Sequence, residues 1–203
     1  EYLFGDIRHV PEAPTFLKSR PISSQNDNSV LLKLDQLRHY YFIPDAKPWC
    51  EKKDAAVWRG VCHREHREKF VAQFFNSPLC DVGGTGRAGT PLHRKPFMSI
   101  PDQLDFKFVL SVEGHDVATN LKWIMASHSL CMMARPQFET WYMEGTLEAG
   151  RHYVELREDY ADLEDKIAYY LAHPAEAEAI ISNAKEYWRK FYDEEREGLV
   201  AYL

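Results

Sequence analysis

The stretch 106–130 reads FKFVLSVEGHDVATNLKWIMASHSL and carries the signals of a strand, a turn and a helix in succession. Its first five residues are largely apolar or aromatic, which predicts a short β-strand. A Glu-Gly pair at 113–114 breaks the strand, and Asp116 is placed to cap a helix over 116–127. A second apolar run at 129–133 follows that helix. The stretch therefore predicts a β-α-β unit with parallel strands and a right-handed crossover.

The predicted helix start would suit an anionic ligand. Ligands of parallel sheets bind beyond the carboxyl ends of the strands. A helix beginning at Asp116 would present unpaired backbone N–H groups there, together with the positive end of the helix dipole, and a diphosphate is the ligand class that fits best. From this segment alone, an ordinary crossover without a ligand explains the pattern equally well.

The remaining residues extend this unit into a Rossmann-like α/β domain over 51–203. Residues 1–50 are expected to be the tail of an N-terminal domain, with Pro44–Asp54 as the linker, because two prolines and a run of charges stand there. The N-terminal patterns predict a strand at 2–7, a loop at 11–29 and an extended segment at 30–43. The later patterns predict strands at 55–58, 79–82 and 153–156, helices at 65–75 and 138–143, and two amphipathic helices that close the chain.

The composition is that of a folded, acidic protein. Hydrophobic residues make up 45% of the 203 residues, which is enough for one full core, and the formal net charge is −6. The chain has no basic stripe for nucleic acid and no apolar run near the roughly 18 residues that a membrane helix needs. We therefore expect no nucleic-acid partner and a protein that is soluble or only peripherally attached to a membrane. Because the first residue is Glu1 and not Met, we expect a fragment of a longer protein.

Neither disulfides nor a metal site is expected. The four cysteines, Cys50, Cys62, Cys80 and Cys131, show no framework spacing, so a reducing compartment is the simpler assumption. A C-H-x-x-H run at 62–66 contains metal-binding residue types but lacks the paired spacing of a structural zinc site. A loop rich in His and Arg that faces an anionic ligand fits this run better.

The run GTGRAG at 84–89 fits the G-x-G-x-x-G pattern of dinucleotide-binding folds, so an oxidoreductase that uses this loop is one alternative. A true fingerprint leads directly into a helix. Here Pro91 and Pro96 follow instead, and no helical periodicity appears before Pro101. We therefore interpret the run as a flexible glycine loop.

Two arginines and a glycine near the first strand of the domain suit a phosphate ligand. Gly60, at the end of that strand, lets the backbone turn and approach a ligand closely. Arg59 and Arg67 offer planar, permanently charged groups that match phosphate oxygens. The alternative is an ordinary ion pair for each arginine.

Several short motifs follow one another in a defined order along the chain. They are D-x-x-H-x-P at 6–11, W-R-G at 58–60 with Arg67 downstream, K-F at 107–108, E-G-H-D-V-A-T-N-L-K-W at 113–123, E-T-W at 139–141, H-Y-V at 152–154 and the run 159–163. Each is weak alone, but their order and spacing are specific. The chain resembles glycosyltransferase family 90, which contains lipopolysaccharide core glycosyltransferases, fungal capsule-associated proteins and animal protein O-glucosyltransferases, and it is most similar to the bacterial lipopolysaccharide members.

The resemblance implies an inverting glycosyltransferase of the two-domain GT-B type that works without a catalytic metal or cofactor. The donor would be a nucleotide sugar, UDP-glucose or UDP-galactose, and the acceptor the lipopolysaccharide core or a related oligosaccharide. It implies a cytoplasmic location, peripheral to the inner membrane. The sequence contains no D-x-D pair, so arginines and a helix start would stabilise the departing diphosphate. The alternative is a catalytically incomplete fragment that binds nucleotide and transfers nothing.

The resemblance also implies roles for residues between the turn and the helix. The nucleotide-sugar-binding residues of this stretch would be Glu113, Gly114, Asp116, Thr119, Asn120 and Lys122. Relatives usually carry an arginine near the position of Asn120, and Lys122 is expected to compensate for the missing charge. Glu113 would accept hydrogen bonds from ribose hydroxyls, or it is a satisfied loop carboxylate.

The base that removes the proton from the acceptor hydroxyl is expected near the start of the chain. Animal relatives have an aspartate in an Arg-Asp-x-Pro context, whereas the run here is R-H-V-P at 8–11, which puts His9 in that position. An imidazole is a competent base at neutral pH. Asp6 is the alternative base, or it would orient His9, and a purely structural histidine is the remaining interpretation.

Overall fold

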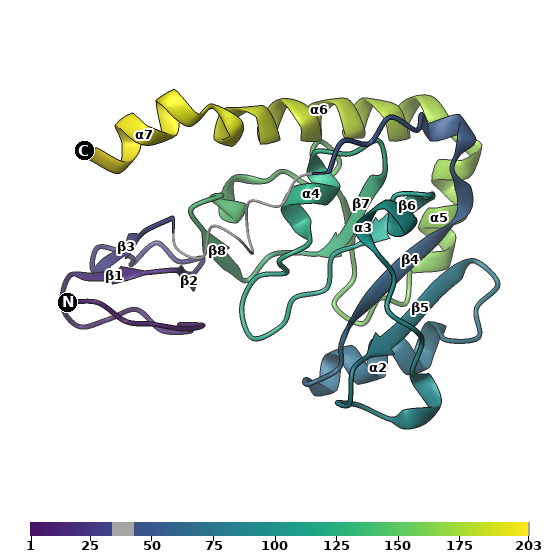
Figure 1. The fold of residues 1–203 in the computed structure, drawn as a ribbon, viewed down its shortest axis with the longest axis horizontal. Helices are drawn as coiled ribbons and strands as arrows, with labels where there is room; N and C mark the ends of the chain where they lie inside the picture. Colours follow the sequence, from purple (N-terminus) through teal and green to yellow (C-terminus); the bar gives the residue numbers. More distant parts are fainter. Residues whose placement is uncertain (34–42, 203) are drawn as a thin grey trace.

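Five parallel strands form the central sheet of the computed structural model, which describes residues 1–33 and 43–202 (Figure 1). Because the sheet is parallel and covered on both faces, the central part of most strands is apolar and buried. From one edge to the other the strands are β5 (Cys80–Thr85), β4 (Lys53–Val61), β6 (Phe106–Leu110), β7 (Leu130–Ala134) and β9 (Val154–Leu156).

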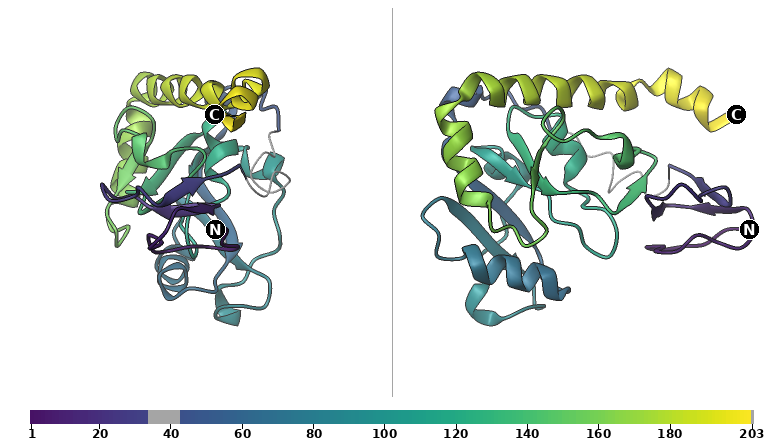
Figure 2. Two further views of the ribbon diagram at one scale, coloured as in Figure 1. Left: turned by 90° about the vertical axis from the view of Figure 1, so that its left-hand side faces the viewer. Right: turned by 180° about the vertical axis from the view of Figure 1, so that it is seen from behind.

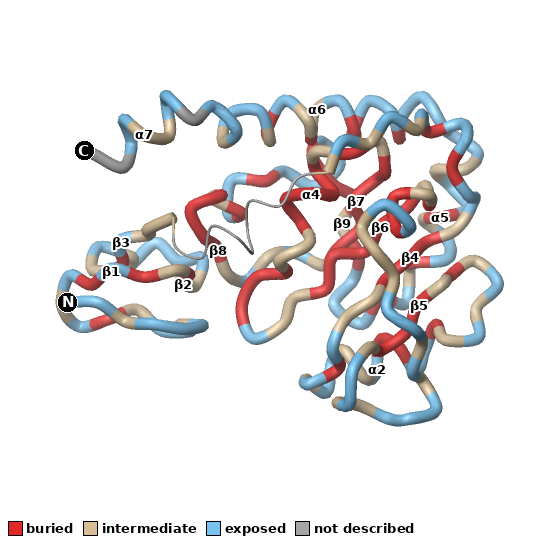
Figure 3. The backbone as a smooth tube through the Cα atoms, viewed as in Figure 1, coloured by how far each residue is buried: buried red, intermediate tan, exposed pale blue. Residues whose placement is uncertain are grey.

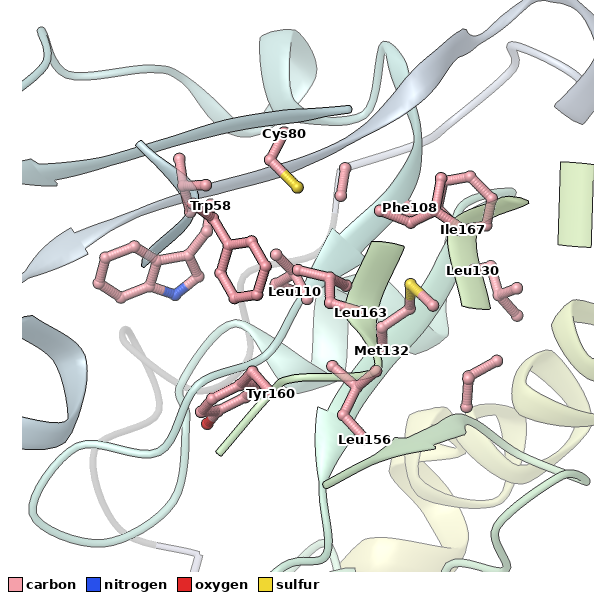
Figure 4. Packing of buried hydrophobic residues seen from close by; sticks show 14 of the residues in the cluster. Trp58, Cys80, Phe108, Leu110, Leu130, Met132, Leu156, Tyr160, Leu163 and Ile167 are labelled. Carbon is pink, nitrogen blue, oxygen red and sulfur yellow. The ribbon is translucent and has the colours of Figure 1, made fainter. Parts of the chain in front are cut away.

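Successive side chains of β4, β6 and β7 enter two different cores, one on each face of the sheet. Figure 3 shows the backbone of the central strands largely in the colour of buried residues. Phe108 and Leu110 of β6 face one core, and Val109 between them faces the other. The first core is closed by helices α2 (Glu65–Phe74) and α5 (Leu163–Ala172), and Figure 4 shows Leu163 and Ile167 of α5 among its residues. The second is closed by α4 (Leu121–Met125) and by part of α6 (Pro174–Tyr192).

The strand order places a topological switch point between β4 and β6. From β4 the chain moves outward to β5, and then returns to the opposite side of β4 to form β6. The connections that leave the carboxyl ends of these two strands therefore run in opposite directions. In open parallel sheets this is where a ligand crevice forms.

The structure confirms the predicted parallel α/β sheet but corrects the helix of the β-α-β unit. The helix expected over 116–127 begins only at Leu121, and residues before it form bends and a turn. Asp116 is buried and forms an ion pair with Lys18 at 2.9 Å, so it does not cap the helix. The predicted N-cap was wrong because a cation from a distant segment holds the carboxylate, which no local pattern reveals.

The segment 138–143 is also corrected. It was expected to be a helix, but its first half is strand β8 (Phe138–Thr140), which pairs antiparallel with β2 (Ser19–Pro21). Arg20 and Glu139 are opposite each other in this pair, and their side chains form an ion pair at 2.8 Å. The strand exists because a partner strand far away in the sequence satisfies its backbone.

Residues 1–33 stand at one end of the molecule, beyond β8 (Figure 2). Their strands β1 (Thr15–Leu17) and β3 (Ser29–Leu31) form a parallel pair. The strand predicted at 2–7 is only an isolated bridge between Tyr2 and Phe16. Of the extended segment predicted at 30–43, residues 34–42 lie outside the described residues.

The predicted linker 44–54 packs against the Rossmann-like body. It contains a short 3-10 helix, η1 (Trp49–Glu51), and the first residues of β4. Lys52 is buried and pairs with Asp45 at 2.8 Å, and Asp45 also accepts a hydrogen bond from the backbone N–H of His128. The boundary between domains at residue 50 stays a prediction.

A buried ion pair lies beneath α4. The ammonium of Lys122 is 3.0 Å from the Glu144 carboxylate, and both side chains are only 1% exposed. The carboxylate also accepts hydrogen bonds from the N–H and hydroxyl of Thr140, at 2.6 and 2.9 Å. The ammonium lies against the rings of Trp141 and Tyr142. This pair joins α4 to the turn after β8.

We expect Lys122→Met to lower the free energy of unfolding by about 3–5 kcal/mol, because it leaves the buried Glu144 carboxylate without its cation. Urea denaturation of purified protein measures this. The double variant Lys122→Met/Glu144→Gln should recover part of the loss, since no buried charge remains. An equal or larger loss in the double variant would contradict the ion-pair explanation.

Candidate active site

A cleft of about 380 Å³ opens at the switch point, between the segments that follow β4 and β6. Trp58, Val61 and His63 form part of its wall on the β4 side. Five of the residues predicted from the sequence also line it: Arg59, Gly60, Arg67, Thr119 and Asn120. The fold therefore brings together residues from three separate parts of the chain at the expected end of the sheet.

A second hollow of about 240 Å³ adjoins this cleft, on the side of β7 and β9. Its lining includes Glu113 and Gly114, which were predicted, and Arg8, His66 and Tyr160, which were not. The segment 113–114 and the side chain of Arg67 lie between the two spaces.

Arg67 clamps the ends of β4 and β6 together. Its guanidinium donates to the carbonyls of Glu113 at 2.8 Å, Val112 at 2.6 Å and Val61 at 3.1 Å. The group also lies 5.5 Å from the Trp58 ring. Burial lowers the pKa of Arg67 from its usual value, but an arginine remains charged. Arg67 thus places a half-buried positive charge in the wall of the cleft.

Two glycines leave the space that this arrangement needs. A Cβ atom on Gly60 would lie 2.5 Å from the indole of Trp58, and one on Gly114 would lie 3.2 Å from the Arg67 guanidinium. From the sequence, Gly60 was expected to allow close approach of a ligand. The structure adds a packing reason, because the neighbouring tryptophan folds over this position.

Asn120 connects the start of α4 to the end of β6. Its amide nitrogen donates to the Leu110 carbonyl at 2.9 Å, and its oxygen accepts from the Ser111 hydroxyl at 3.2 Å. These bonds hold Thr119 and Asn120 at the rim of the cleft. The amide is therefore a positioning group in this structure, and a contact with a phosphate or ribose stays a prediction.

The side chain of Arg59 turns away from the cleft, although the residue lines its wall. Its guanidinium pairs with the Asp81 carboxylate at 2.7 Å and donates to the Asp81 carbonyl at 2.6 Å. Arg59 therefore forms the ordinary ion pair that was the alternative to a phosphate contact. A phosphate contact by Arg59 stays a prediction.

The proposed role of Lys122 is wrong. Its ammonium is buried and held by Glu144, so it cannot replace an arginine at a phosphate. Asp116 likewise serves another purpose, since it shares the ammonium of Lys18 with Asp6. Burial alone would lower the pKa of Lys18, but its bonds to the two carboxylates raise it.

The candidate bases lie in the N-terminal segment that reaches this region. Asp6 is bound to Lys18, and His9 is exposed. Between them in the chain, Arg8 borders the second hollow and lies 5.3 Å from the Phe138 ring. The segment 6–9 is therefore next to the site, and the choice between His9 and Asp6 stays a prediction.

Glu113 is a half-buried acid at the centre of the site. One carboxylate oxygen accepts a hydrogen bond from the backbone N–H of Gln137 at 3.1 Å. Burial is the main reason that the pKa of Glu113 rises to about 7, and the neighbouring carboxylates of Glu144 and Asp116 add to the rise. Near neutral pH this group can exist with or without its proton.

A group of histidines and arginines surrounds the mouth of the site. His66 donates to the Glu113 carbonyl at 2.8 Å, the rings of His63 and His115 stack 6.0 Å apart, and Arg64 contacts His115. The H-R-E-H-R run at 63–67 gave the sequence signal for an anion-facing loop. His115, Arg8 and Tyr160 were missed as site residues, because nothing in their local sequence places them beside Arg67.

Comparison with known proteins agrees with this geometry. The family model described as glycosyl transferase family 90 matches residues 39–196. The chain belongs to glycosyltransferase family 90. It is 52% identical over 202 residues to the O-glucosyltransferase LpsA of Dichelobacter nodosus, covering 98% of this chain and 63% of that protein. It is 29% identical over 139 residues to human protein O-glucosyltransferase 3, covering 65% of this chain and 27% of that protein.

The fold is also that of a known glycosyltransferase domain. The C-terminal domain of the glycosyl transferase group 1 family protein LpcC from Francisella tularensis superposes with a TM-score of 0.51. The alignment covers 77% of this chain and 98% of that domain, at 13% sequence identity. The aligned part of this family 90 chain therefore has the fold of the Rossmann-like C-terminal domain of a GT-B glycosyltransferase.

The glycine loop has no role as a dinucleotide fingerprint. β5 ends at Thr85, and the chain continues through bends into a single 3-10 turn, η2 (Pro91–His93). A pyrophosphate would need the start of an α-helix directly after the glycines. The next α-helix is α3 (Ile100–Gln103), eleven residues beyond Gly89, so the oxidoreductase alternative is contradicted.

We expect the raised pKa of Glu113 to make the ligand-free protein less stable as pH rises from about 4.5 to 7. In that window the folded state holds a proton that the unfolded state has lost, so the unfolding free energy falls by at most about 3 kcal/mol. Glu113→Gln carries no titrating proton and should be more stable than wild type at pH 8 but similar at pH 4.5. Urea denaturation at both pH values measures this.

Glu65→Gln is the matched control, since Glu65 is exposed on α2 and its pKa is lowered by its bond to Lys69. A lowered pKa adds pH dependence only below about 4.5, where the stabilisation from this carboxylate is lost, so above that pH the profile of Glu65→Gln should run parallel to that of wild type. Parallel profiles of Glu113→Gln and wild type would show that the Glu113 carboxyl is not perturbed by burial.

Proposed function

We propose that this chain is the donor-binding part of an inverting glycosyltransferase that moves a hexose, glucose or galactose, from a UDP-sugar to the lipopolysaccharide core or a related glycan. The observation that carries the proposal is the cleft at the switch point of a family 90 domain, with the half-buried Arg67 guanidinium in its wall. The name of the relative from Dichelobacter nodosus supports transfer of glucose.

The charge distribution around the cleft supports a diphosphate as the leaving group. The N-terminus of α2 begins beside the cleft, and the side chain of its N-cap residue, Arg64, makes no capping hydrogen bond. Its free N–H groups carry partial positive charge, and His63 and Arg67 lie on the wall nearby. These groups would stabilise the negative charge that develops on UDP when the bond to the sugar breaks.

The proposed reaction needs no cofactor, because the donor sugar brings its own leaving group. A base removes the proton from the acceptor hydroxyl, and the oxygen attacks the anomeric carbon while UDP departs with the bonding electrons from the opposite face. His9 is the proposed base and Asp6 the second candidate. We propose a metal-independent reaction, with Arg67 and the α2 terminus supplying positive charge.

The acceptor and the location extend the proposal further. A lipopolysaccharide or related oligosaccharide acceptor, reached from the cytoplasmic side of the inner membrane, would follow from kinship with the bacterial members. Within the described parts of the chain, no helix is both long and apolar enough to cross a bilayer.

A nucleotide-binding part without transfer activity is the second candidate. The chain spans 63% of the length of its relative from Dichelobacter nodosus. In this second proposal, acceptor binding would need residues outside the matched part. Calorimetry of this chain with UDP and turnover assays on the full-length protein separate the two candidates.

We expect UDP to bind this chain with or without magnesium, and Arg67→Ala to weaken that binding by about 1–3 kcal/mol through loss of a charge-assisted bond. Isothermal titration calorimetry measures both, with NAD as a ligand that should not bind. Lys69→Ala is the matched control, because Lys69 lies on the same helix but is exposed and paired only with Glu65 among the described residues. Equal UDP affinity of Arg67→Ala and Lys69→Ala would remove Arg67 from the site.

We expect His9→Ala in the full-length protein to abolish sugar transfer while UDP affinity stays unchanged, because the base contacts the acceptor and not the nucleotide. Release of UDP from UDP-glucose and UDP-galactose in the presence of acceptor measures transfer. Asp6→Asn should retain part of the activity. Full turnover by His9→Ala together with an inactive Asp6→Asn would assign the base to Asp6.

A further inference from the structure

The loop between β5 and α3 has a charge that contrasts with the rest of the chain. Residues 82–101 contain no Asp or Glu, although the whole protein has 31 acidic residues and a net charge of −6. In the same stretch stand Arg87, Arg94 and Lys95. We call residues 86–97, which hold these cations, the basic loop.

The basic loop also exposes two large apolar side chains. Leu92 is 81% exposed and Phe97 is 83% exposed. Large apolar residues usually lie inside a protein, and an isolated one on the surface needs no explanation. Two such residues within six positions, flanked by cations and free of acids, form the pattern of a membrane-surface segment.

The loop has a defined shape, so this exposure does not come from a lack of contacts. The Lys95 N–H donates to the Gly84 carbonyl at 2.9 Å, and the Arg94 guanidinium donates to the Arg87 carbonyl at 2.6 Å. Gly89 has a φ of +85°, and a Cβ there would lie 2.7 Å from the side chain of Cys62. The inner side of the loop therefore packs on the protein while Leu92 and Phe97 face solvent.

The loop lies next to the donor cleft. It leaves the carboxyl end of β5, and it forms the lowest part of the molecule in Figure 1, below α2. A Cβ on Gly86 would be 4.0 Å from Val61, which lines the cleft, and Cys62 lies under the loop with Gly84 and His93. Whatever binds the loop is thus held beside the open side of the site.

We propose that the basic loop docks on the surface of an anionic lipid bilayer. Leu92 and Phe97 enter the boundary between headgroups and acyl chains, and Arg87 and Arg94 bind lipid phosphates. A protein partner fits less well, because a projecting loop tip offers far less than the roughly 800 Å² per partner of a stable interface. A bilayer needs no matching groove.

This contact explains how a protein with a net negative charge stays at a negative surface. Charges farther away than a Debye length, about 8 Å at physiological salt, are screened. Within the loop, Lys95 is paired with Asp81 at 2.8 Å, so Arg87 and Arg94 are the cations that would decide the interaction. The inference does not depend on sugar transfer. If the proposed function holds, docking would present the cleft to acceptors anchored in the same bilayer.

Sedimentation of the full-length protein with lipid vesicles tests the proposal. We expect binding to vesicles with about one-third phosphatidylglycerol, little binding to phosphatidylcholine vesicles, and release at about 0.5 M salt. Arg87→Gln should weaken binding about five-fold, the effect of one cation near such a surface. Leu92→Ser/Phe97→Ser should weaken it at least ten-fold, by analogy with loss of two buried apolar side chains.

Leu199→Ser/Val200→Ser is the matched control. These side chains are 64% and 61% exposed on α7 (Glu194–Tyr202), where Glu195 and Glu197 precede them. This variant should bind vesicles like wild type. The UDP affinity of Leu92→Ser/Phe97→Ser, measured by calorimetry, should equal that of wild type. Equal affinity would show that this variant is folded and that its loss of vesicle binding is separate from donor binding.

Three results would overturn the proposal. The wild-type protein could fail to bind anionic vesicles, which would mean that another part of the full chain covers the loop or that it has no lipid affinity. Leu92→Ser/Phe97→Ser could bind as tightly as wild type, which would place membrane contact elsewhere. A soluble acidic polypeptide could displace the protein from vesicles, and its own binding to the protein could be lost in Leu92→Ser/Phe97→Ser. That result would make the partner of the loop a protein and not a bilayer.

Discussion

The bonds from Arg67 to the carbonyls at the ends of β4 and β6 are the interaction on which the site depends. At the switch point the chain leaves two neighbouring strands in opposite directions, so the carbonyls of Val61, Val112 and Glu113 lose the partners that a sheet would give them. One guanidinium satisfies all three. A lysine could not, because its donors spread from a single nitrogen, whereas the fork of an arginine reaches carbonyls on two segments. Gly60 and Gly114 complete the arrangement by leaving room for the Trp58 ring and the guanidinium.

The same clamp sets the electrostatics of the cleft. Arg67 spends its hydrogen bonds on neutral carbonyls and not on a carboxylate, so its charge is not cancelled within the site. The carboxylate of Glu113 is one group that could neutralise this charge. Burial raises the pKa of Glu113 to about 7, so near neutral pH part of the population is protonated and carries no negative charge. His63, His66 and the start of α2 lie on the same side, but the first turn of that helix also carries Glu65 and Glu68. The Arg67 guanidinium is therefore the positive group in the wall that an anionic ligand would meet.

The sequence predicted what local patterns control and missed what distant residues control. Strands buried on both faces are apolar in their central part, so the apolar runs in β4, β6 and β7 were visible without any structure. The absence of a helix after the glycine loop followed equally from its prolines. By contrast, Lys18 holds Asp116 and Arg20 pairs with Glu139 from about a hundred residues away, and these partners replace a predicted cap and a predicted helix. The prediction that Lys122 contacts a phosphate failed for a related reason. The local sequence around this lysine does not show that a buried carboxylate, Glu144, binds it from 22 positions later in the chain.

These long-range partners also bear on the choice of base. Lys18 is bound to Asp6 in the N-terminal segment and to Asp116 in the loop after β6, so one ammonium joins these two segments. A carboxylate held by an ammonium directs its oxygens to that cation and is less free to take a proton from a sugar hydroxyl. His9 is exposed beside Arg8, which already borders the hollow that contains Glu113. Within the proposed reaction, this ion pair is an argument for His9 as the base, with Asp6 and Lys18 as the groups that fix the position of its segment.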